Sequence, residues 1–379
     1  MKDKAIRLFI SGDFAPTLRV NEIIQKGEFQ SLYNNMLPVI QEADYAITNL
    51  ELPLLDKGIP SVKTGPNLKA PTNSIDAIKF AGFNLVTLAN NHIMDYGADG
   101  LLSTIDLCSK NSIEYIGVGA TLKEAKEIRY KNIKGKRIAF INIAENEWST
   151  TFKDSYGVNP LDEIDVFYQI SEAKLNSDFI ILIIHGGHET YELPSPRMKK
   201  LYRFFIDLGV DVVVGHHTHC YSGHEVYKDK PIFYSLGNFI FDNKMFRNNS
   251  FWNKGCAVTI SLFEAKIEFQ LHPFSQCDDK PGVFLFDEEN YKRFVDENII
   301  KTDIILNDKQ LVKEYDSFVA KQTKVYKSLI EPFHNRYILG AMNKGFLPRL
   351  ISGYQKDLLF NIIRCESHRE LLLSVLSKK

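Results

Sequence analysis

The sequence predicts an α/β layered fold. Apolar runs rich in β-branched residues alternate along the chain with helix-like stretches, and six of these runs lead directly into polar side chains. With 379 residues, of which 44% are hydrophobic and 12% aromatic, the chain can bury a large core. We expect one large domain over residues 1–275 and a mostly helical extension over residues 276–379.

The six apolar runs are expected to be strands, and each ends in side chains that can bind a metal or form hydrogen bonds. They are RLFIS before Asp13, YAIT before Asn49 and Glu51, FNLVTLA before Asn91 and His92, FIILII before His185, VDVVV before His216, His217 and His219, and PIFYSL before Asn238. Ligands of open α/β sheets bind beyond the carboxyl ends of the strands, where loops gather distant residues. The pattern therefore predicts one site assembled from six loops.

Helix signals separate these strands. Between the fourth and fifth runs, Ser195 can cap a helix, Pro196 fits its first turn and Gly209 ends it. Its apolar stripe is expected to consist of Leu201, Phe204, Phe205 and Leu208. Residues 71–82 predict a helix that ends near Gly82, and residues 100–110 predict a further amphipathic helix.

After about residue 275 the sequence changes character. Lys- and Glu-bearing stretches with heptad-like apolar spacing, LVKEYDSFVAKQTKVYKSLI and LLFNIIRCESHRELLLSVL, predict helices. Their apolar stripes offer a surface for a homo-oligomer contact or for a partner. His334 and His368 have no acidic or histidine partner pattern nearby, so we expect them to be structural or surface residues.

Charge and cysteine content limit the partners and the compartment. The 46 basic and 47 acidic residues leave a net charge of -1, which gives no global attraction to nucleic acid or to a membrane surface. The five cysteines are scattered and form no CxxC pair, which argues against a disulfide framework and a thiolate zinc site. The N-terminal apolar stretch is too short for a signal peptide, and no segment reaches about 18 uninterrupted apolar residues. We expect a cytoplasmic protein without direct membrane insertion.

The residues at the strand ends are the ligand types of a divalent metal centre. Asp13 and Glu51 offer carboxylate oxygen, Asn91 offers amide oxygen, and His185 and the histidines after residue 215 offer imidazole nitrogen. A two-metal centre also needs a carboxylate that can bridge the ions. Each motif alone has a plain structural explanation as a turn, a helix cap or a hydrogen-bonded loop. Their conjunction at successive strand ends favours a metal site.

The same blocks resemble a known family. GD, NLE, AGFNLVTLANNHIMDYG, GVGATLKEA, IIHGG, VDVVVGHHTH and FYSLGNFIFD together look like the CapA family of poly-γ-glutamate capsule synthesis proteins, from about residue 5 to about residue 275. That family resembles the calcineurin-like metallophosphoesterases in fold. The resemblance implies a four-layer αββα sandwich of metallophosphoesterase type and a centre with one or two divalent ions, which would be Mn, Fe or Zn.

The resemblance also implies roles for single residues. Asp13 stands at the position of the first-metal aspartate, Glu51 at that of the bridging carboxylate, and Asn91 and His185 at positions that ligate the second metal. Two members of the set His216, His217 and His219 would ligate one ion each. We expect the neighbouring His224 to serve the loop or the substrate, and Cys220 to be a packing residue.

The remaining candidates would handle the substrate. By the resemblance, His92 would contact the substrate or protonate the leaving group. Asp95 follows three residues later and either orients His92 or caps a helix. Asn49 and Asn238 are candidates for substrate binding, with a structural role as the alternative.

The sequence departs from the phosphoesterase pattern at the first metal. Those enzymes commonly carry a histidine two residues after the first aspartate, whereas Phe14 and Ala15 follow Asp13 here. The bridging position is Glu51 rather than an aspartate, which lengthens its reach by one methylene. We expect a centre that binds its first metal weakly or holds a single ion.

Three functions remain open at this point. The leading hypothesis is a metal-dependent hydrolase that acts on a phosphate ester or a related anionic bond of a small molecule or polymer, in capsule, poly-γ-glutamate or surface-polysaccharide biosynthesis. The alternatives are a non-catalytic binding or assembly component of an anionic-polymer synthesis machine, and a hydrolase of amide bonds in such a polymer. The absent first-metal histidine favours the binding component, while Asn91, His92 and the later histidines favour the enzyme.

Overall fold

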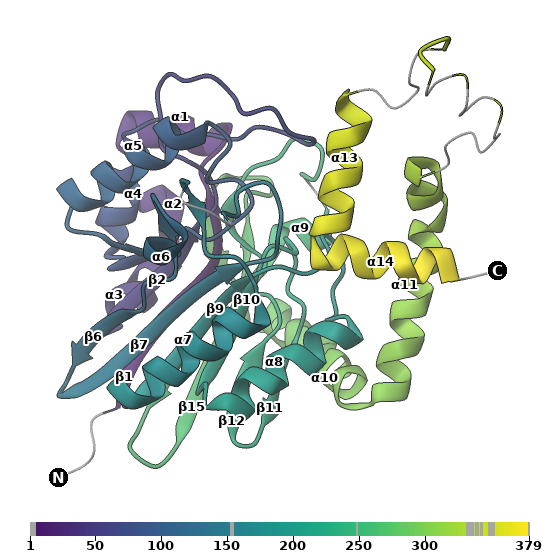
Figure 1. The fold of residues 1–379 in the computed structure, drawn as a ribbon. Coiled ribbons are helices and arrows are strands. Elements are labelled where there is room, and N and C mark those ends of the chain that lie inside the picture. The colour runs from purple at the N-terminus through teal and green to yellow at the C-terminus, as the bar shows by residue number, and fades with distance from the viewer. Residues whose placement is uncertain are drawn as a thin grey trace.

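The computed structural model describes residues 5–151, 155–247, 249–330, 337, 341, 344–347 and 353–377. In these residues two large β-sheets face each other, and helices cover both outer faces (Figure 1). The predicted four-layer α/β sandwich with a helical C-terminal part is confirmed.

The first sheet mixes parallel and antiparallel strands. Its order is β16 (Val283–Leu285), β15 (Ile267–Gln276), β14 (Lys254–Leu262), β1 (Ile6–Ala15), β2 (Tyr45–Leu50), β3 (Leu85–Thr87) and β4 (Glu114–Ile116), and β13 (Asn238–Phe241) pairs with β1. Strands β1 to β4 and β13 run parallel, whereas β14, β15 and β16 are antiparallel additions at one edge. The parallel strands therefore end at the same edge of the sheet.

The second sheet supplies the other half of the site. Its order is β11 (His224–Tyr227), β12 (Lys230–Phe233), β10 (Val212–His216), β9 (Phe179–His185), β7 (Lys136–Ala144) and β6 (Arg129–Ile133). Strands β7, β9 and β10 are parallel neighbours, and His185 is in register with His216. A small separate pair joins β5 (Val118–Gly119) to β8 (Gly157–Val158).

Three hydrophobic clusters hold the layers together. The cluster between the sheets contains side chains of β1, β2, β7, β9 and β10, such as Leu8, Ile47 and Ile183. The outer face of the first sheet packs against α1 (Arg19–Lys26), α2 (Gln30–Tyr33), α3 (Leu37–Gln41), α4 (Ser74–Ala81) and α5 (Gly97–Lys110). The outer face of the second sheet packs against α7 (Glu163–Asn176) and α8 (Pro196–Leu208). Short helical segments are η1 (Asn34–Met36), α6 (Leu122–Ala125) and α9 (Ser250–Asn253).

The predicted helix signals hold in α8, whose buried face agrees only in part with the predicted stripe: Phe205 is buried and Leu201 and Leu208 pack against the core, but Phe204 does not. The Ser195 hydroxyl accepts a hydrogen bond from the Met198 N–H, and the helix ends at Gly209, whose φ is 123°. The buried residues are Met198, Lys199, Tyr202, Phe205 and Ile206, whereas Phe204 is 42% exposed. Both registers satisfy a helical period, and packing against the sheet selects the one that begins at Met198.

The sixth predicted strand also differs from the prediction. The run PIFYSL does not continue to Asn238, because β12 ends at Phe233 and Asn238 begins β13. β13 crosses to the first sheet, where Asn238 pairs with Asp13. Asn238 therefore opens a strand of the opposite sheet instead of closing one.

The C-terminal region forms four helices among the described residues. They are α10 (Glu288–Leu306), α11 (Asp308–Ile330), α13 (Gly353–Arg364) and α14 (Glu366–Ser377), and α11, α13 and α14 stand together at one side of the sandwich (Figure 1). The second predicted helical stretch is broken at Cys365, which separates α13 from α14. His334 lies outside the described residues. The division near residue 275 stays a prediction.

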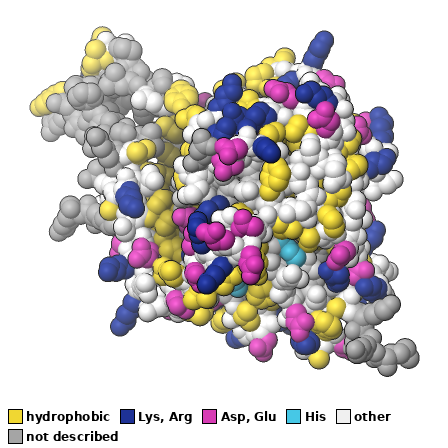
Figure 2. All heavy atoms as spheres, turned by 180° about the vertical axis from the view of Figure 1, so that it is seen from behind, with side chains coloured by type: hydrophobic (Ala, Val, Ile, Leu, Met, Phe, Trp, Pro, Cys, Tyr) yellow, Lys and Arg dark blue, Asp and Glu magenta, His cyan; other side chains and the backbone are white. Residues whose placement is uncertain are grey.

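The molecular surface matches the near-neutral composition. On the face shown in Figure 2, basic and acidic side chains are interspersed and no single sign dominates. None of the helices in the described part of the chain combines the length and apolar character needed to cross a bilayer. The cytoplasmic location stays a prediction.

Candidate metal centre

The site lies where the parallel strands of both sheets end. Asp13 near the end of β1, Glu51 after β2 and Asn91 after β3 come from the first sheet, and His185 at the end of β9 comes from the second. The pairing of β1 shifts register at Asp13 with both β2 and β13, and a bulge of this kind redirects a side chain. Six distant segments of the chain therefore converge, as the strand-end pattern predicts.

A glycine allows the close approach of two backbones at this point. A Cβ atom on Gly12 would lie 1.8 Å from the carbonyl oxygen of Gly237, which is far inside van der Waals contact. The Asp13 N–H donates to the same carbonyl at 3.1 Å. Gly12 thus lets the segment before β13 pack directly beneath the Asp13 carboxylate.

Glu51 belongs to two overlapping groups of metal-capable side chains. One group is Asp13, Glu51 and His219, and the other is Glu51, His185 and His217, with ligand atoms in each group within 4.8 Å of one another. Glu51 Oε1 is 3.7 Å from His185 Nε2 and 3.9 Å from His219 Nε2. This is the position of a carboxylate that can bridge two ions.

The Glu51 carboxylate has no hydrogen-bond partner in the structure. Both of its oxygens are buried and unpaired. Burial, followed by the charge of Asp13, raises the pKa of Glu51 well above its usual value. An unpaired buried carboxylate is costly, whereas a bound cation would compensate both oxygens. The residues present therefore fit a divalent metal centre.

Burial favours the neutral, metal-binding form of two of the imidazoles, those of His185 and His219. Burial and the nearby His217 lower the pKa of His185 well below its usual value, and burial also lowers the pKa of His219. Neutral imidazole is the form that binds metals. For His217, burial acts in the same direction, but the negative charges of Glu147, Glu189, Glu145 and Asp13 together outweigh it and raise the pKa.

Two of these histidines have strained backbone conformations. His217 has a φ of 91° and His219 a φ of 59°, in the left-handed region that residues other than glycine rarely adopt. Such strain costs about 1–3 kcal/mol for each residue and concentrates at functional sites. The loop after β10 therefore places both imidazoles at an energetic cost that surrounding contacts must offset.

His216 and His224 lie apart from the two metal-capable groups. The His216 ring is turned toward the β1 backbone, with Nε2 3.1 Å from the Ser11 carbonyl oxygen. His224 Nδ1 is 2.9 Å from the Tyr221 hydroxyl, and its ring stacks on Phe233. Of the set from His216 to His219, the structure thus brings His217 and His219 to the other ligand types.

Asn91 and the two candidate substrate residues also contact this cluster. Asn91 Oδ1 lies 3.0 Å from His185 Nε2. The Asn49 amide donates to Asp13 Oδ1 at 2.8 Å, and Asn238 Oδ1 lies 2.9 Å from His219 Nδ1. Asn49 and Asn238 therefore orient metal-capable side chains in this structure, and substrate binding by them stays a prediction.

His92 and Asp95 meet beside the cluster. His92 Nδ1 is 2.7 Å from Asp95 Oδ2, as the orienting role requires. Lys63, which the sequence did not single out, forms a buried ion pair with Asp95 and lies 3.3 Å from His92 Nδ1. Its loop has no strand or helix signal, and only the tertiary fold places it here.

Two further acidic residues near the site were also missed. Glu147 Oε1 lies 3.4 Å from His217 Nε2, and Glu189 lines a cavity of about 270 Å³ beside His217. The cavity is lined by Gly187, His188, Glu189, Thr190, His217, Phe318, Gln322, Tyr326, His368 and Leu371. The C-terminal helices therefore form one wall of the space next to the centre.

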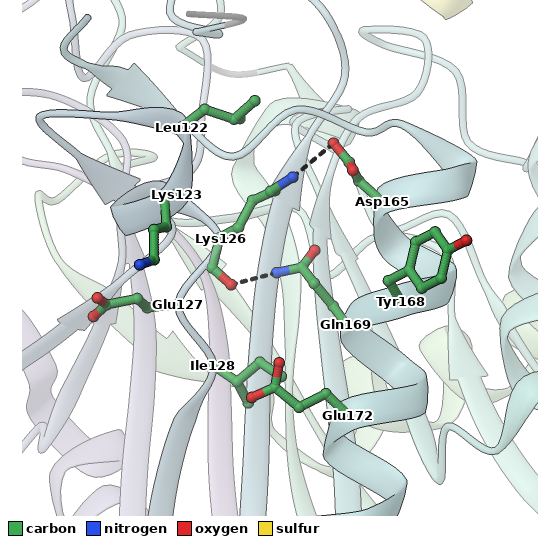
Figure 3. Close-up of a pocket in the computed structure, with 9 residues that line it drawn as sticks. All are labelled: Leu122, Lys123, Lys126, Glu127, Ile128, Asp165, Tyr168, Gln169 and Glu172. Atoms are coloured by element: carbon green, nitrogen blue, oxygen red, sulfur yellow. Dashed lines mark hydrogen bonds and ion pairs between the residues drawn. The ribbon is translucent and has the colours of Figure 1, made fainter. Parts of the chain in front are cut away.

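A separate surface hollow of about 630 Å³ lies between α6 and α7 (Figure 3). Lys126 forms an ion pair with Asp165 at 2.9 Å, and the Gln169 amide donates to the Lys126 carbonyl. The hollow shares no lining residue with the metal-capable groups. The Asp165 carboxylate in it is paired with Lys126, unlike the Glu51 carboxylate.

The fold and the site define a four-layer α/β protein with a candidate dinuclear metal centre at the strand ends. The family model for the bacterial capsule synthesis protein PGA_cap matches residues 7–243, more than half of the chain, and the chain belongs to this family. The family resemblance seen in the sequence is confirmed.

The chain is also similar to curated relatives and to a solved structure. The chain is 32% identical over 250 residues to the capsule biosynthesis protein CapA of Bacillus anthracis, and 31% identical over 244 residues to the PGA biosynthesis protein CapA of Bacillus subtilis. These alignments cover 64% and 63% of this chain, and 61% and 64% of the relatives, so the chain spans less than two thirds of their length. The solved structure of TT1561 of Thermus thermophilus matches with a TM-score of 0.38 and 9% identity, over 70% of this chain and 99% of that chain.

Proposed function

We propose that the protein is a metal-dependent hydrolase that acts on a phosphate ester or a related anionic bond in the synthesis of a capsule or of poly-γ-glutamate. The observation that carries the proposal is the unpaired, buried Glu51 carboxylate, which belongs to two overlapping sets of imidazole and carboxylate side chains. The names of the Bacillus relatives support the assignment to capsule and poly-γ-glutamate synthesis.

Two overlapping sets of side chains would hold the ions. Asp13, Glu51 and His219 would hold one ion, and Glu51, His185 and His217 the other. A bound divalent ion supplies activated water and stabilises negative charge that develops on the substrate. Asn49 fixes the Asp13 carboxylate and Asn238 fixes the His219 ring, so the first set is held by hydrogen bonds on both sides.

His92 is suited to donate a proton to the leaving group. Asp95 engages Nδ1, which leaves Nε2 as the atom that delivers the proton. Lys63 neutralises part of the Asp95 charge and adds a buried positive charge at the site. A local cation of this kind would attract an anionic substrate to a protein whose net charge is only -1.

One observation favours a binding or assembly component as the second candidate. Phe14 and Ala15 follow Asp13 and are fully buried. Because neither is a histidine, no imidazole stands at the position where phosphoesterases carry the first-metal histidine. The first set consequently offers fewer nitrogen ligands, and a metal bound there would be held less tightly. A protein that keeps the fold for binding an anionic polymer would tolerate this loss. Hydrolysis of an amide bond in such a polymer uses the same ligands.

The test combines metal analysis with turnover of aryl phosphate mono- and diesters, with and without manganese. We expect the parent to bind metal and to show manganese-stimulated turnover, and His92→Ala to keep its metal but lose roughly 10²–10⁴-fold in rate. His224→Gln is the control, because His224 begins β11 and lies outside the metal-capable groups. A parent without metal and without metal-stimulated turnover would favour the binding component. A His92→Ala variant as fast as the parent would disprove the proton-donor role alone.

A further inference from the structure

A third group of metal-capable side chains lies where the C-terminal helices meet the sandwich. Glu147 follows β7, Cys365 joins α13 to α14, and His368 lies in the first turn of α14. One ligand atom from each residue lies within 4.8 Å of the others, and Cys365 and Glu147 are buried. This group shares no residue with the two sets around Glu51.

We propose that Glu147, Cys365 and His368 form a separate site for a single zinc ion, which fastens the C-terminal helices to the sandwich. Thiolate, imidazole and carboxylate are the three side-chain ligand types of zinc, whereas manganese and magnesium prefer oxygen. Around a tetrahedral zinc ion at about 2.0–2.3 Å, ligand atoms lie roughly 3.5 Å apart. The ligand atoms of the group, which lie within 4.8 Å of one another, would move closer together on binding.

The three side chains are positioned by contacts that flank them on both chain segments. The Asn146 N–H, next to Glu147, donates to Glu366 Oε2 at 2.9 Å, and the Ser367 hydroxyl donates to the Glu145 carboxylate. Arg197 from α8 forms ion pairs with Glu145 and with Glu370 of α14. The segment before α14 is thus fixed against the loop after β7, residue by residue.

His368 also has the outer contact that metal-bound histidines use. Its Nδ1 lies 2.7 Å from the hydroxyl of Tyr326, a residue of α11. A ring that donates from Nδ1 to this oxygen presents an unprotonated Nε2, and the contact fixes its orientation. The i, i+3 spacing of Cys365 and His368 at a helix start is the local sequence signal for this pair.

The surroundings of Cys365 distinguish it from the other cysteines. All five are buried and reduced, but Cys108, Cys220, Cys256 and Cys277 belong to no metal-capable group among the described residues. Cys365 Sγ lies 3.9 Å from Glu147 Oε1, and Glu147 Oε1 in turn lies 3.4 Å from His217 Nε2. Glu147 therefore connects the proposed site to the candidate dinuclear centre.

Cobalt substitution of the full-length protein tests this site without any activity measurement. Cobalt bound by a thiolate gives a ligand-to-metal charge-transfer band that nitrogen and oxygen ligands do not give. We expect the band in the parent and in the matched control Cys277→Ser. Cys365→Ser should lose the band and should bind one equivalent of metal less than the parent. Cys277 is equally buried but lies outside every metal-capable group of the described residues.

Two further variants keep the result interpretable. His368→Gln leaves the thiol in place and is expected to weaken the band and the zinc content, so it reports on the site if Cys365→Ser does not fold. Glu51→Gln removes the carboxylate shared by the dinuclear sets and is expected to retain the band, which separates this site from the proposed hydrolase centre. The proposal is overturned if the cobalt-loaded parent lacks the band, or if Cys365→Ser and His368→Gln bind as much metal as the parent.

Discussion

Glu51→Gln should make the metal-free protein more stable, which is the reverse of the usual effect of changing a buried glutamate. Both Glu51 oxygens are buried without partners, and Asp13 adds a second negative charge nearby. Glu225 provides the contrast, because its equally buried carboxylate accepts hydrogen bonds from Arg203 at 2.9 Å and from Tyr234 at 2.6 Å. The two glutamates share burial and differ only in their partners.

The magnitudes follow from that difference. Replacing the unpaired Glu51 carboxyl by a neutral amide should stabilise the metal-free protein by roughly 1–3 kcal/mol, since the carboxyl must either stay charged without a partner or take up a proton, and the amide does neither. Glu225→Gln leaves the Arg203 charge uncompensated, and breaking a buried pair in this way costs about 3–5 kcal/mol. Metal present at roughly 100 times its dissociation constant should stabilise the parent by about 2.7 kcal/mol. It should stabilise Glu51→Gln much less.

Urea denaturation in chelator and in manganese measures all of these differences. The expected pattern is a reversal of order, with Glu51→Gln more stable than the parent in chelator and less stable in manganese. Glu225→Gln should be destabilised under both conditions. If Glu51→Gln is destabilised in chelator as Glu225→Gln is, the carboxylate is satisfied without metal and the reasoning about the centre is wrong.

Two predictions concern the framework. Burial lowers the pKa of His272 from 6.5 to about 4, so as the pH falls His272 is protonated in the unfolded chain before it is protonated in the folded protein. The contribution of His272 to the free energy of unfolding is therefore complete above pH 6.5, and it falls toward pH 4 by up to about 1.4 kcal/mol per pH unit. Denaturation of the parent and His272→Gln between about pH 4.5 and 7 should give a smaller slope of stability against pH for His272→Gln than for the parent, and equal slopes would refute it. Phe205→Ala should lower the free energy of unfolding by about 3–5 kcal/mol, and the neighbouring Phe204→Ala by less than about 1 kcal/mol. The reason is that Phe205 is buried and Phe204 is 42% exposed. If urea denaturation shows similar losses for the two variants, the packing of α8 is contradicted.

Local signals were sufficient for most of the fold. Strands with β-branched runs and helices with caps depend on residues close in sequence, so β9, β10 and the ends of α8 could be predicted. The buried face of α8 could not be predicted, because Phe204 and Phe205 are equally apolar and packing against the sheet decides which of them is buried.

The site, like the fold, has some features that local sequence predicted and others that only the tertiary structure decided. Strand-end polar residues indicated Asp13, Glu51, His185 and the later histidines, because parallel strands end at one edge. Which of the histidines join the metal-capable groups depends on the backbone turn after β10. His217 has a φ of 91° in this turn, and its ring does not point where the His216 ring points. Lys63 carried no signal at all, since its loop gains a fixed position through tertiary contacts, among them those with Asp95 and His92.

The sequence by itself determined the layered α/β fold, the family and the set of ligand types, since each of these is encoded in short segments and their order. Only the tertiary structure decided that Glu51 stands unpaired between two ligand sets and that Cys365 and His368 meet Glu147. The reason is distance along the chain: residues 147 and 365 are brought together by packed helices and buried ion pairs. No local pattern of either segment specifies the other.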